Sequence, residues 1–172
     1  FPSNKTISID DEDMEITIES FDPYHVEFPQ GIFVKKICVS DRHCLALTTT
    51  GECYSWGDNS FGQIGVGAGY NEIIGNPKKI NFDVFDSDGH KYVTENKPII
   101  YDIAVGEDFS LALGIFKDKK ILYHWGNGAG VANELVNQII LEVKSNHPVP
   151  LRGIDNIVKI FAKNNTIGII AW

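Results

Sequence analysis

The sequence is short of basic residues and of long apolar runs. Of its 172 residues, 15 are Lys or Arg and 23 are Asp or Glu, which gives a net charge of −8 and a pI of about 5.0. A nucleic-acid-binding surface needs clustered Lys and Arg to displace counterions from phosphates, so we expect no nucleic-acid partner. The same charge argues against an anionic membrane surface as a partner.

No apolar run in the sequence approaches the roughly 20 residues that span a bilayer. The first residues also lack a basic segment followed by an apolar one, which predicts that no signal peptide is present. These absences predict a cytoplasmic or nuclear protein that does not bind membranes. Hydrophobic residues nevertheless make up 43% of the chain, which is enough for a buried core.

Cysteine is scarce, with only Cys38, Cys44 and Cys53 in the chain. An odd number argues against a disulfide framework, and we expect reduced thiols, as is usual inside cells. One pairing stays open, because a tight hairpin after Val39 would place Cys38 opposite Cys44. A zinc site built from the cysteines and His43 matches no familiar ligand spacing, so we predict no metal.

Familiar catalytic motifs are absent as well. The sequence has no Gly-x-Ser-x-Gly, no His-Glu-x-x-His and no pair of carboxylates placed by a motif. The stretch 86–89, Asp-Ser-Asp-Gly, starts like a calcium loop but lacks the later ligands. The glycines of 62–69 are not followed by the Lys-Ser or Lys-Thr of a phosphate loop and fit a connecting turn better. We therefore predict no cofactor and no enzyme chemistry.

What the sequence does contain is an internal repeat. Residues 37–47, ICVSDRHCLAL, align with residues 103–113, IAVGEDFSLAL. Further on, Tyr-Ser-Trp-Gly at 54–57 aligns with Tyr-His-Trp-Gly at 123–126, after a slightly longer turn in the second copy. Residues 157–170 repeat the same order of strand, polar turn and strand. Self-similarity of this kind indicates stacked supersecondary units.

Each unit has the pattern of β-structure. Apolar and β-branched runs are separated by Gly, Asn, Asp or Ser, and in the first unit these runs are 32–39, 43–48 and 53–56. The runs are apolar on both faces, as expected of sheets that neighbouring sheets cover on both sides. One unit is too small to bury its faces alone. We therefore predict an all-β fold of β-propeller blades, each a four-stranded antiparallel sheet, in an incomplete ring.

The first unit resembles the repeat of the regulator of chromosome condensation family, whose members form seven-bladed propellers. The positions that carry the resemblance are 37–47, Gly51, the Tyr-Ser-Trp-Gly at 54–57, Asn59, Gly62-Gln63-Ile64-Gly65 and Gly67. The second unit keeps Gly106, Leu111-Ala112-Leu113, Tyr123 and Trp125-Gly126-Asn127. It departs from the family by having Phe109 where the repeat usually has His, and by lacking the glycine-rich turn after Asn127.

The resemblance covers roughly residues 28–172, as about two and a half repeats. It divides the chain into a lead-in or the end of a preceding blade at 1–27, repeats at about 28–80 and 98–150, and a truncated repeat at 151–172. Two and a half repeats cannot close a ring of seven, and open blade faces expose contiguous apolar surface. We therefore expect self-association, or remaining blades supplied by another chain.

Two insertions interrupt the repeats. The insertion at 82–97 could project as a hairpin that turns at Asp88-Gly89. In the insertion at 130–146, a helical stripe and an extended strand both fit the pattern. A lengthened surface loop accounts equally well for each insertion, so the choice stays open.

Five motif residues are expected to have structural roles: His43, Trp56, Gly57, Trp125 and Gly126. Each Trp supplies a large buried area and an indole N–H that needs an acceptor. The following Gly lets the backbone turn without a Cβ. His43 occupies the repeat's usual histidine position, where we expect it to cap the turn rather than to perform acid–base chemistry.

The resemblance also implies a function. The founding member of the family is a guanine-nucleotide exchange factor for a small nuclear GTPase, and it acts by differential binding rather than by covalent chemistry. Its partner meets one propeller face, at the turns before the histidine position and at a projecting β-wedge. The matching turn residues here are Asp41, Arg42, Glu107, Asp108, Asn164 and Asn165, and the candidate wedge residues are Asp86, Asp88 and His90.

We therefore expect a protein-interaction module, a fragment of a propeller from a larger regulatory protein. The alternative is a guanine-nucleotide exchange factor for a Ran-like small GTPase. In both cases the partner is a protein, and the site residues act by contact.

Overall fold

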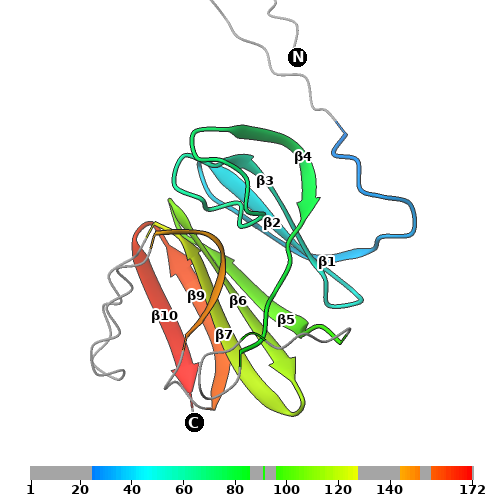
Figure 1. The fold of residues 1–172 in the computed structure, drawn as a ribbon, viewed down its shortest axis with the longest axis vertical. Helices are drawn as coiled ribbons and strands as arrows, with labels where there is room; N and C mark the ends of the chain where they lie inside the picture. The colour runs from blue at the N-terminus through cyan, green and yellow to red at the C-terminus, as the bar shows by residue number, and fades with distance from the viewer. Residues whose placement is uncertain (1–24, 86–90, 92–95, 128–143, 152–155, 172) are drawn as a thin grey trace, which may run out of the picture.

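The computed structural model describes residues 25–85, 91, 96–127, 144–151 and 156–171. Every regular element in this part is a β-strand, and the strands form three antiparallel sheets in chain order (Figure 1). The predicted all-β fold of propeller blades in an open ring is confirmed. Within the described residues, no helix is long and apolar enough to cross a membrane.

The first sheet has the order β1-β2-β3-β4. Its strands are β1 (Val34–Val39), β2 (His43–Thr48), β3 (Cys53–Asp58) and β4 (Ile73–Lys79). Short polar turns reverse the chain after β1 and β2, while a longer loop, residues 59–72, joins β3 to β4.

The second sheet repeats this arrangement with the order β5-β6-β7-β8. Its strands are β5 (Ile99–Val105), β6 (Phe109–Phe116), β7 (Lys119–Gly126) and β8 (Ser145–Leu151). The third sheet has two strands, β9 (Ile157–Lys163) and β10 (Thr166–Ala171). Figure 1 shows the first sheet at the top and the other two side by side below it.

Two apolar cores hold the sheets together. The core between the first and second sheets includes Leu45, Leu47, Tyr123 and Trp125, each at most 1% exposed. The core between the second and third sheets uses the opposite face of the second sheet. Its buried members are Ala104, Phe109, Leu111, Leu113, Leu122, Ile157, Ile160 and Ile167. The second sheet is thus buried on both faces, which explains the apolar residues on both faces of its strands.

The segments that lead into β1 and β5 pack in the same way. Phe28 lies edge-on against the Tyr and Trp of β3, with ring centroids 5.7 and 5.8 Å apart. Phe82 lies edge-on against the Tyr and Trp of β7, at 5.0 and 5.8 Å. Edge-to-face aromatic pairs at these separations stabilise beyond the area they bury. Phe28 therefore belongs to the repeat and covers the face of β3 that points away from the second sheet.

The hairpin of β1 and β2 contradicts the pairing of Cys38 with Cys44. Cys38 lies opposite Leu45, and Cys44 lies opposite Val39. Because neighbouring positions along a strand point to opposite faces, the two thiols leave the sheet on opposite sides. All three cysteines are free, and burial raises the pKa of the Cys53 thiol well above its usual range.

The sequence did not locate the fourth strands. Pro77 lies within β4, and Pro148 and Pro150 lie within β8, although proline before the next unit is the usual mark of a linker. Both strands are the outermost of their sheets, where proline is tolerated because one edge needs no backbone donor.

Candidate partner-binding surface

The turns that join the first two strands of each sheet meet at one end of the molecule. These turns are residues 40–42, 106–108 and 164–165. A cavity of about 380 Å³ lies among them and is lined by residues of all three turns, including Asp41, Glu107 and Asn164. We call this region the turn surface.

The second and third turns touch directly. The backbone N–H of Glu107 donates to the Asn164 carbonyl oxygen at 2.8 Å. A Cβ on Gly106 would lie 2.6 Å from the same oxygen, so only glycine permits this approach. The turn surface is therefore held by backbone contacts as well as by side chains.

Three of the predicted partner-binding residues, Asp41, Glu107 and Asn164, line the cavity. Asp41 and Asn164 are exposed, and Glu107 is partly exposed. No described residue forms an ion pair with Asp41 or Glu107. Lys163 is the basic side chain in the lining. The cavity thus offers two carboxylates and an amide to a partner. Asn165 is exposed in the same turn but does not line the cavity.

Arg42 and Asp108 bridge the first and second sheets instead. The Arg42 guanidinium lies 3.1 Å from an Asp58 carboxylate oxygen and 3.2 Å from an Asp108 oxygen. The hydrogen bond to Asp58 and the charge of Asp108 raise the pKa of Arg42. Burial raises the pKa of Asp108, and Arg42 offsets part of that rise. The Asp108 side chain is only 17% exposed, so its contacts are mainly internal.

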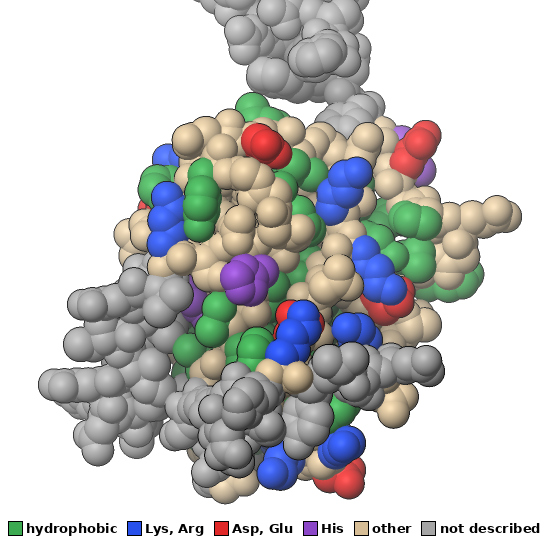
Figure 2. Space-filling model, viewed as in Figure 1, with side chains coloured by type: hydrophobic (Ala, Val, Ile, Leu, Met, Phe, Trp, Pro, Cys, Tyr) green, Lys and Arg blue, Asp and Glu red, His purple; other side chains and the backbone are tan. Residues whose placement is uncertain are grey.

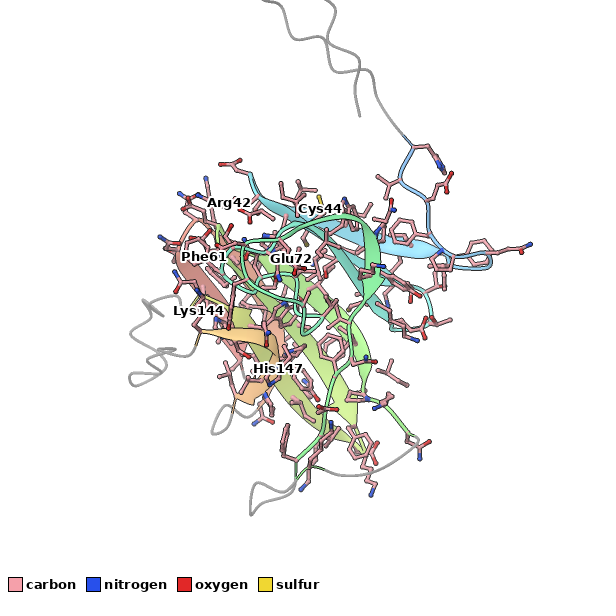
Figure 3. All side chains as sticks on the ribbon, turned by 45° about the horizontal axis from the view of Figure 1, so that its top comes forward. Arg42, Cys44, Phe61, Glu72, Lys144 and His147 are labelled. Carbon is pink, nitrogen blue, oxygen red and sulfur yellow. The ribbon has the colours of Figure 1, made fainter. Side chains whose placement is uncertain are left out.

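A row of cations and aromatic rings continues the turn surface across loop 59–72. The Phe61 ring centroid lies 5.9 Å from the Arg42 guanidinium and 5.2 Å from the Lys144 ammonium. Lys144 also lies 4.3 Å from the Tyr70 ring centroid. Figure 3 shows Arg42, Phe61 and Lys144 in sequence along this side. This row could not be predicted from the sequence, because Lys144 comes from a different repeat than the two aromatic rings.

His43 is buried beneath the turn surface and joins the first two sheets. Its Nδ1 lies 3.0 Å from Ser40 Oγ, and its Nε2 lies 2.7 Å from Ser110 Oγ. Ser110 in turn donates to the Gln63 carbonyl oxygen at 3.0 Å, so Nε2 carries the proton. Burial lowers the pKa of His43 to about 4, which leaves the ring neutral at pH 7. We infer that it orders the turn rather than transferring protons.

Gln63 is the point where loop 59–72 docks on the second sheet. Its carbonyl oxygen also accepts the indole N–H of Trp125 at 2.8 Å. A Cβ on the nearby Gly65 would come within 2.6 Å of the Trp125 ring. The loop thus connects strands of the first sheet while completing the packing of the second.

The second interface replaces this polar network with apolar side chains. Phe109 stands in the place of His43, and Ile167 stands in the place of Ser110; both are buried in the core between the second and third sheets. His124 stands in the place of Ser55 and is 2% exposed, and its Nε2 has no hydrogen-bond partner among the described residues. Burial lowers its pKa to about 4.

The remaining motif residues lie where the sheets turn or pack. Gly57 is the next-to-last residue of β3 and Gly126 is the last residue of β7, and their φ angles are 116° and 93°. A Cβ at either would collide with the backbone before β2 or β6. Trp56 packs under Phe28. Within the described residues, no group of His, Cys, Asp and Glu is placed to hold a metal ion.

The candidate wedge residues Asp86, Asp88 and His90 lie outside the described residues. Within the insertion at 82–97, Phe85 and Lys91 form an antiparallel bridge. Lys91 also pairs with Asp83 at 2.7 Å. The insertion at 130–146 is described only from residue 144, where it enters β8.

Family comparison agrees with the internal repeat. Models of the regulator of chromosome condensation (RCC1) repeat match residues 34–63 and 50–113. The chain carries RCC1 repeats.

The chain spans about an eighth or less of the length of the curated relatives that it matches. The ultraviolet-B receptor UVR8 of Arabidopsis thaliana is 42% identical over 60 residues, which are 35% of this chain and 13% of the receptor. The human E3 ubiquitin-protein ligase HERC2 is 45% identical over 47 residues, 26% of this chain and 1% of the ligase. The human probable ligase HERC6 is 28% identical over 134 residues, 75% of this chain and 12% of that protein.

Solved structures share the fold. Human WBSCR16 has a TM-score of 0.62 and 22% identity, covering 92% of this chain and 35% of its own. Prp20p of Saccharomyces cerevisiae, described with its binding to Gsp1p and histones, has a TM-score of 0.60 and 19% identity, covering 90% of this chain and 34% of its own. At these identities the likeness concerns the arrangement of the blades.

Proposed function

We propose that this RCC1-repeat chain is a protein-interaction module of a larger regulatory protein and binds its partner at the turn surface. The observation that carries the proposal is the cavity that three turns from three successive sheets line together. Binding residues commonly lie on loops that a rigid scaffold positions. Here the scaffold is two buried cores, and a backbone hydrogen bond fixes two of the turns.

The chemistry of the turn surface favours a protein partner with a basic contact residue. Asp41 and Glu107 have no ionic partner among the described residues, and they lie on neighbouring turns of one cavity. Complementary charge raises association rates and rejects wrong partners. Nearby, Phe61 and Tyr70 offer aromatic area on loop 59–72, and aromatic residues are enriched at the energetic centres of interfaces.

Charge reversal at the turn surface tests the proposal. Proteins captured from a cell extract by the unchanged chain are identified by mass spectrometry, and their binding is then measured to Asp41→Lys and Glu107→Lys. The control is Glu27→Lys, which makes the same charge change at an exposed acidic residue on the lead into β1. Loss of binding in both turn variants but not in the control is expected. Equal binding by all variants would contradict a role for this surface.

Nucleotide exchange on a Ran-like small GTPase is the second candidate. It is favoured by the position of the predicted exchange residues at one end of the blades, and by the binding of Prp20p, a structural relative, to Gsp1p. Release of labelled GDP from a panel of small GTPases, measured with and without the chain, distinguishes the two candidates. Acceleration that Glu107→Lys abolishes would favour exchange, whereas binding without acceleration would favour the interaction module.

A further inference from the structure

Lys144 lies against two aromatic rings of loop 59–72. Its ammonium is 5.2 Å from the Phe61 ring centroid and 4.3 Å from the Tyr70 ring centroid. Both distances are within the range of about 6 Å over which an aromatic ring attracts a cation. Lys144 directly precedes β8 of the second sheet, whereas both rings belong to a loop of the first sheet. Figure 3 shows Phe61 and Lys144 on the same side of the molecule.

The two rings are held in place by hydrogen bonds of the loop rather than by the lysine. The side chain of Asn59, which is 1% exposed, donates to the Gly69 carbonyl oxygen at 2.8 Å. The Gly67 N–H donates to the Asn146 carbonyl oxygen at 2.8 Å, and the Asn146 side chain donates to the Ala68 carbonyl oxygen at 3.1 Å. The loop is thus fixed internally and on β8, so the rings form a preorganised surface.

The ammonium of Lys144 is an exchangeable occupant of this surface. Among the described residues, no carboxylate forms an ion pair with it. The neighbouring Arg42 is different, because its guanidinium lies 3.1 and 3.2 Å from carboxylate oxygens of Asp58 and Asp108. Lys144 is exposed, and contacts between an exposed cation and a ring are weak. Another cation can therefore replace Lys144 more easily than Arg42.

The present occupant indicates which ligand chemistry the rings accept. Phe61 is partly exposed and Tyr70 is 40% exposed, so a ligand can reach both side chains. An unmodified lysine of a partner would carry the same group as Lys144, which has the advantage of a high local concentration. A trimethylated lysine competes better, because the ammonium of lysine is strongly hydrated, whereas trimethylation removes its N–H donors to water. Quaternary ammonium groups are the ligands that aromatic sites recognise most typically.

We propose that Phe61 and Tyr70 form a binding site for a trimethylated lysine of a partner protein, and that Lys144 occupies the site until the partner displaces it. Internal competition lowers the apparent affinity for every cation and thereby favours the best one. The lining of the turn-surface cavity contains none of these three residues. The proposal does not rest on the proposed function, because different variants test binding at Asp41 and Glu107.

Short peptides test the site directly. The probe is Gly-Ser-Lys-Ser-Gly, made with unmodified lysine, with trimethyllysine, and with an uncharged analogue in which carbon replaces the trimethylated nitrogen. Each peptide is titrated into the chain carrying isotope-labelled phenylalanine and tyrosine, and the NMR shifts of the Phe61 and Tyr70 rings report both affinity and location. The trimethyllysine peptide should bind saturably, and the other two about tenfold more weakly or worse. Equal binding of the uncharged analogue would overturn the proposal.

Variants of the chain test the role of each residue. Lys144→Met removes the occupant and should tighten binding of the trimethyllysine peptide about fivefold, because two exposed ring contacts no longer compete with it. The matched control Lys78→Met removes an exposed lysine of β4 and should leave the affinity unchanged. Tyr70→Leu should abolish binding, whereas Tyr70→Phe, which keeps a ring, should retain it.

Three results would contradict the site or its occupant. Equal binding by Tyr70→Leu and Tyr70→Phe would show that the ring is not needed, and circular dichroism verifies that both variants are folded. An affinity that Lys144→Met leaves unchanged would show that Lys144 does not compete. Failure of the trimethyllysine peptide to bind even to Lys144→Met would show that the rings are not a site for this ligand.

Discussion

A single buried histidine shows how the repeat tolerates change. At the first interface His43 and Ser110 form a hydrogen-bonded pair, and at the second interface the corresponding residues are Phe109 and Ile167. In the polar pair the buried groups hydrogen-bond to each other, and in the apolar pair no buried side chain needs a hydrogen bond. A mixed pair leaves a buried polar group without a partner, which costs free energy.

We predict that His43→Phe alone lowers the free energy of unfolding by about 1–3 kcal/mol, because Ser40 and Ser110 each lose a partner. The double variant His43→Phe with Ser110→Ile should recover part of the loss, since it reproduces the second interface. Urea unfolding of the two single variants and the double variant gives the coupling energy. Strictly additive effects would show that the two positions are not coupled.

The same histidine should make stability depend on pH. The pKa of His43 is about 4 in the folded chain and near 6.5 when unfolded. Between these values the unfolded chain binds a proton that the folded chain excludes, so stability falls as the pH drops from about 6.5 to about 4, and is insensitive to this group above that range.

His124, with a pKa of about 4 as well, adds to the effect. The expected slope is roughly 1.4 kcal/mol per pH unit for each histidine. Urea midpoints measured across this range should show a shallower slope for His43→Phe. A wild-type midpoint that stays constant from pH 6.5 to pH 4.5 would contradict the assignment.

At the scale of elements, loop 59–72 does more than connect β3 to β4. Gly65 and Gly67 have φ near 76° and 75°, but a Cβ at Gly65 would overlap Trp125, whereas nothing lies within 4 Å of one at Gly67. Gly67→Ala should therefore cost only the backbone strain, about 1–2 kcal/mol.

Gly65→Ala should cost clearly more than Gly67→Ala, because it also displaces the loop from the indole ring. Chemical denaturation of the two variants measures the difference. The fluorescence of the buried Trp125 provides a second measurement, and it should change only for Gly65→Ala. Equal losses of stability in the two variants would mean that the packing of the loop against Trp125 does not contribute to stability.

The sequence predicted the inner three strands of each complete sheet, because their apolar runs and intervening turns are local signals. It did not predict β4 and β8, whose Asn, Lys, His and Pro residues suit a solvent-exposed edge and resemble a linker. The roles of Ser110 and the Gln63 carbonyl were also missed, because those contacts join residues from different repeats. Asp41, Glu107 and Asn164 could be grouped from the sequence, because the alignment of the repeats assigns them to equivalent turns without any information about distances.

At the scale of the whole molecule, Asp102 links all three sheets. Its carboxylate accepts from Lys36 Nζ on β1 at 2.6 Å and from the Ile160 N–H on β9 at 3.4 Å. Its side chain is 14% exposed and that of Lys36 is 38% exposed, so the pair is partly shielded from water, and removing the carboxylate would leave a partly buried donor without this acceptor.

We predict that Asp102→Ala loosens the third sheet before it unfolds the rest. Amide hydrogen exchange should accelerate in residues 157–171 while β6 and β7 stay protected, because local openings report the weakest packed unit. Glu52→Ala, which removes the partner of Lys79 on the outer strand β4, serves as the control. Uniform acceleration across all sheets for Asp102→Ala would instead indicate a global loss of stability.

The exposed apolar side chains bear on assembly. Phe33, Val39 and Ile73 are 71, 66 and 84% exposed, and apolar surface of this kind favours association. We expect the chain to self-associate with rising concentration in multi-angle light scattering. A constant monomer mass over the accessible range would contradict this expectation.

The docking of loop 59–72 on the following sheet gives the repeats a direction. A substitution in this loop lies in one repeat of the sequence but disturbs the packing of the next repeat. In a genetic screen, second-site changes that rescue a damaged Gly65 should therefore map one repeat downstream, around Trp125, rather than among the neighbours of Gly65 in its own sheet.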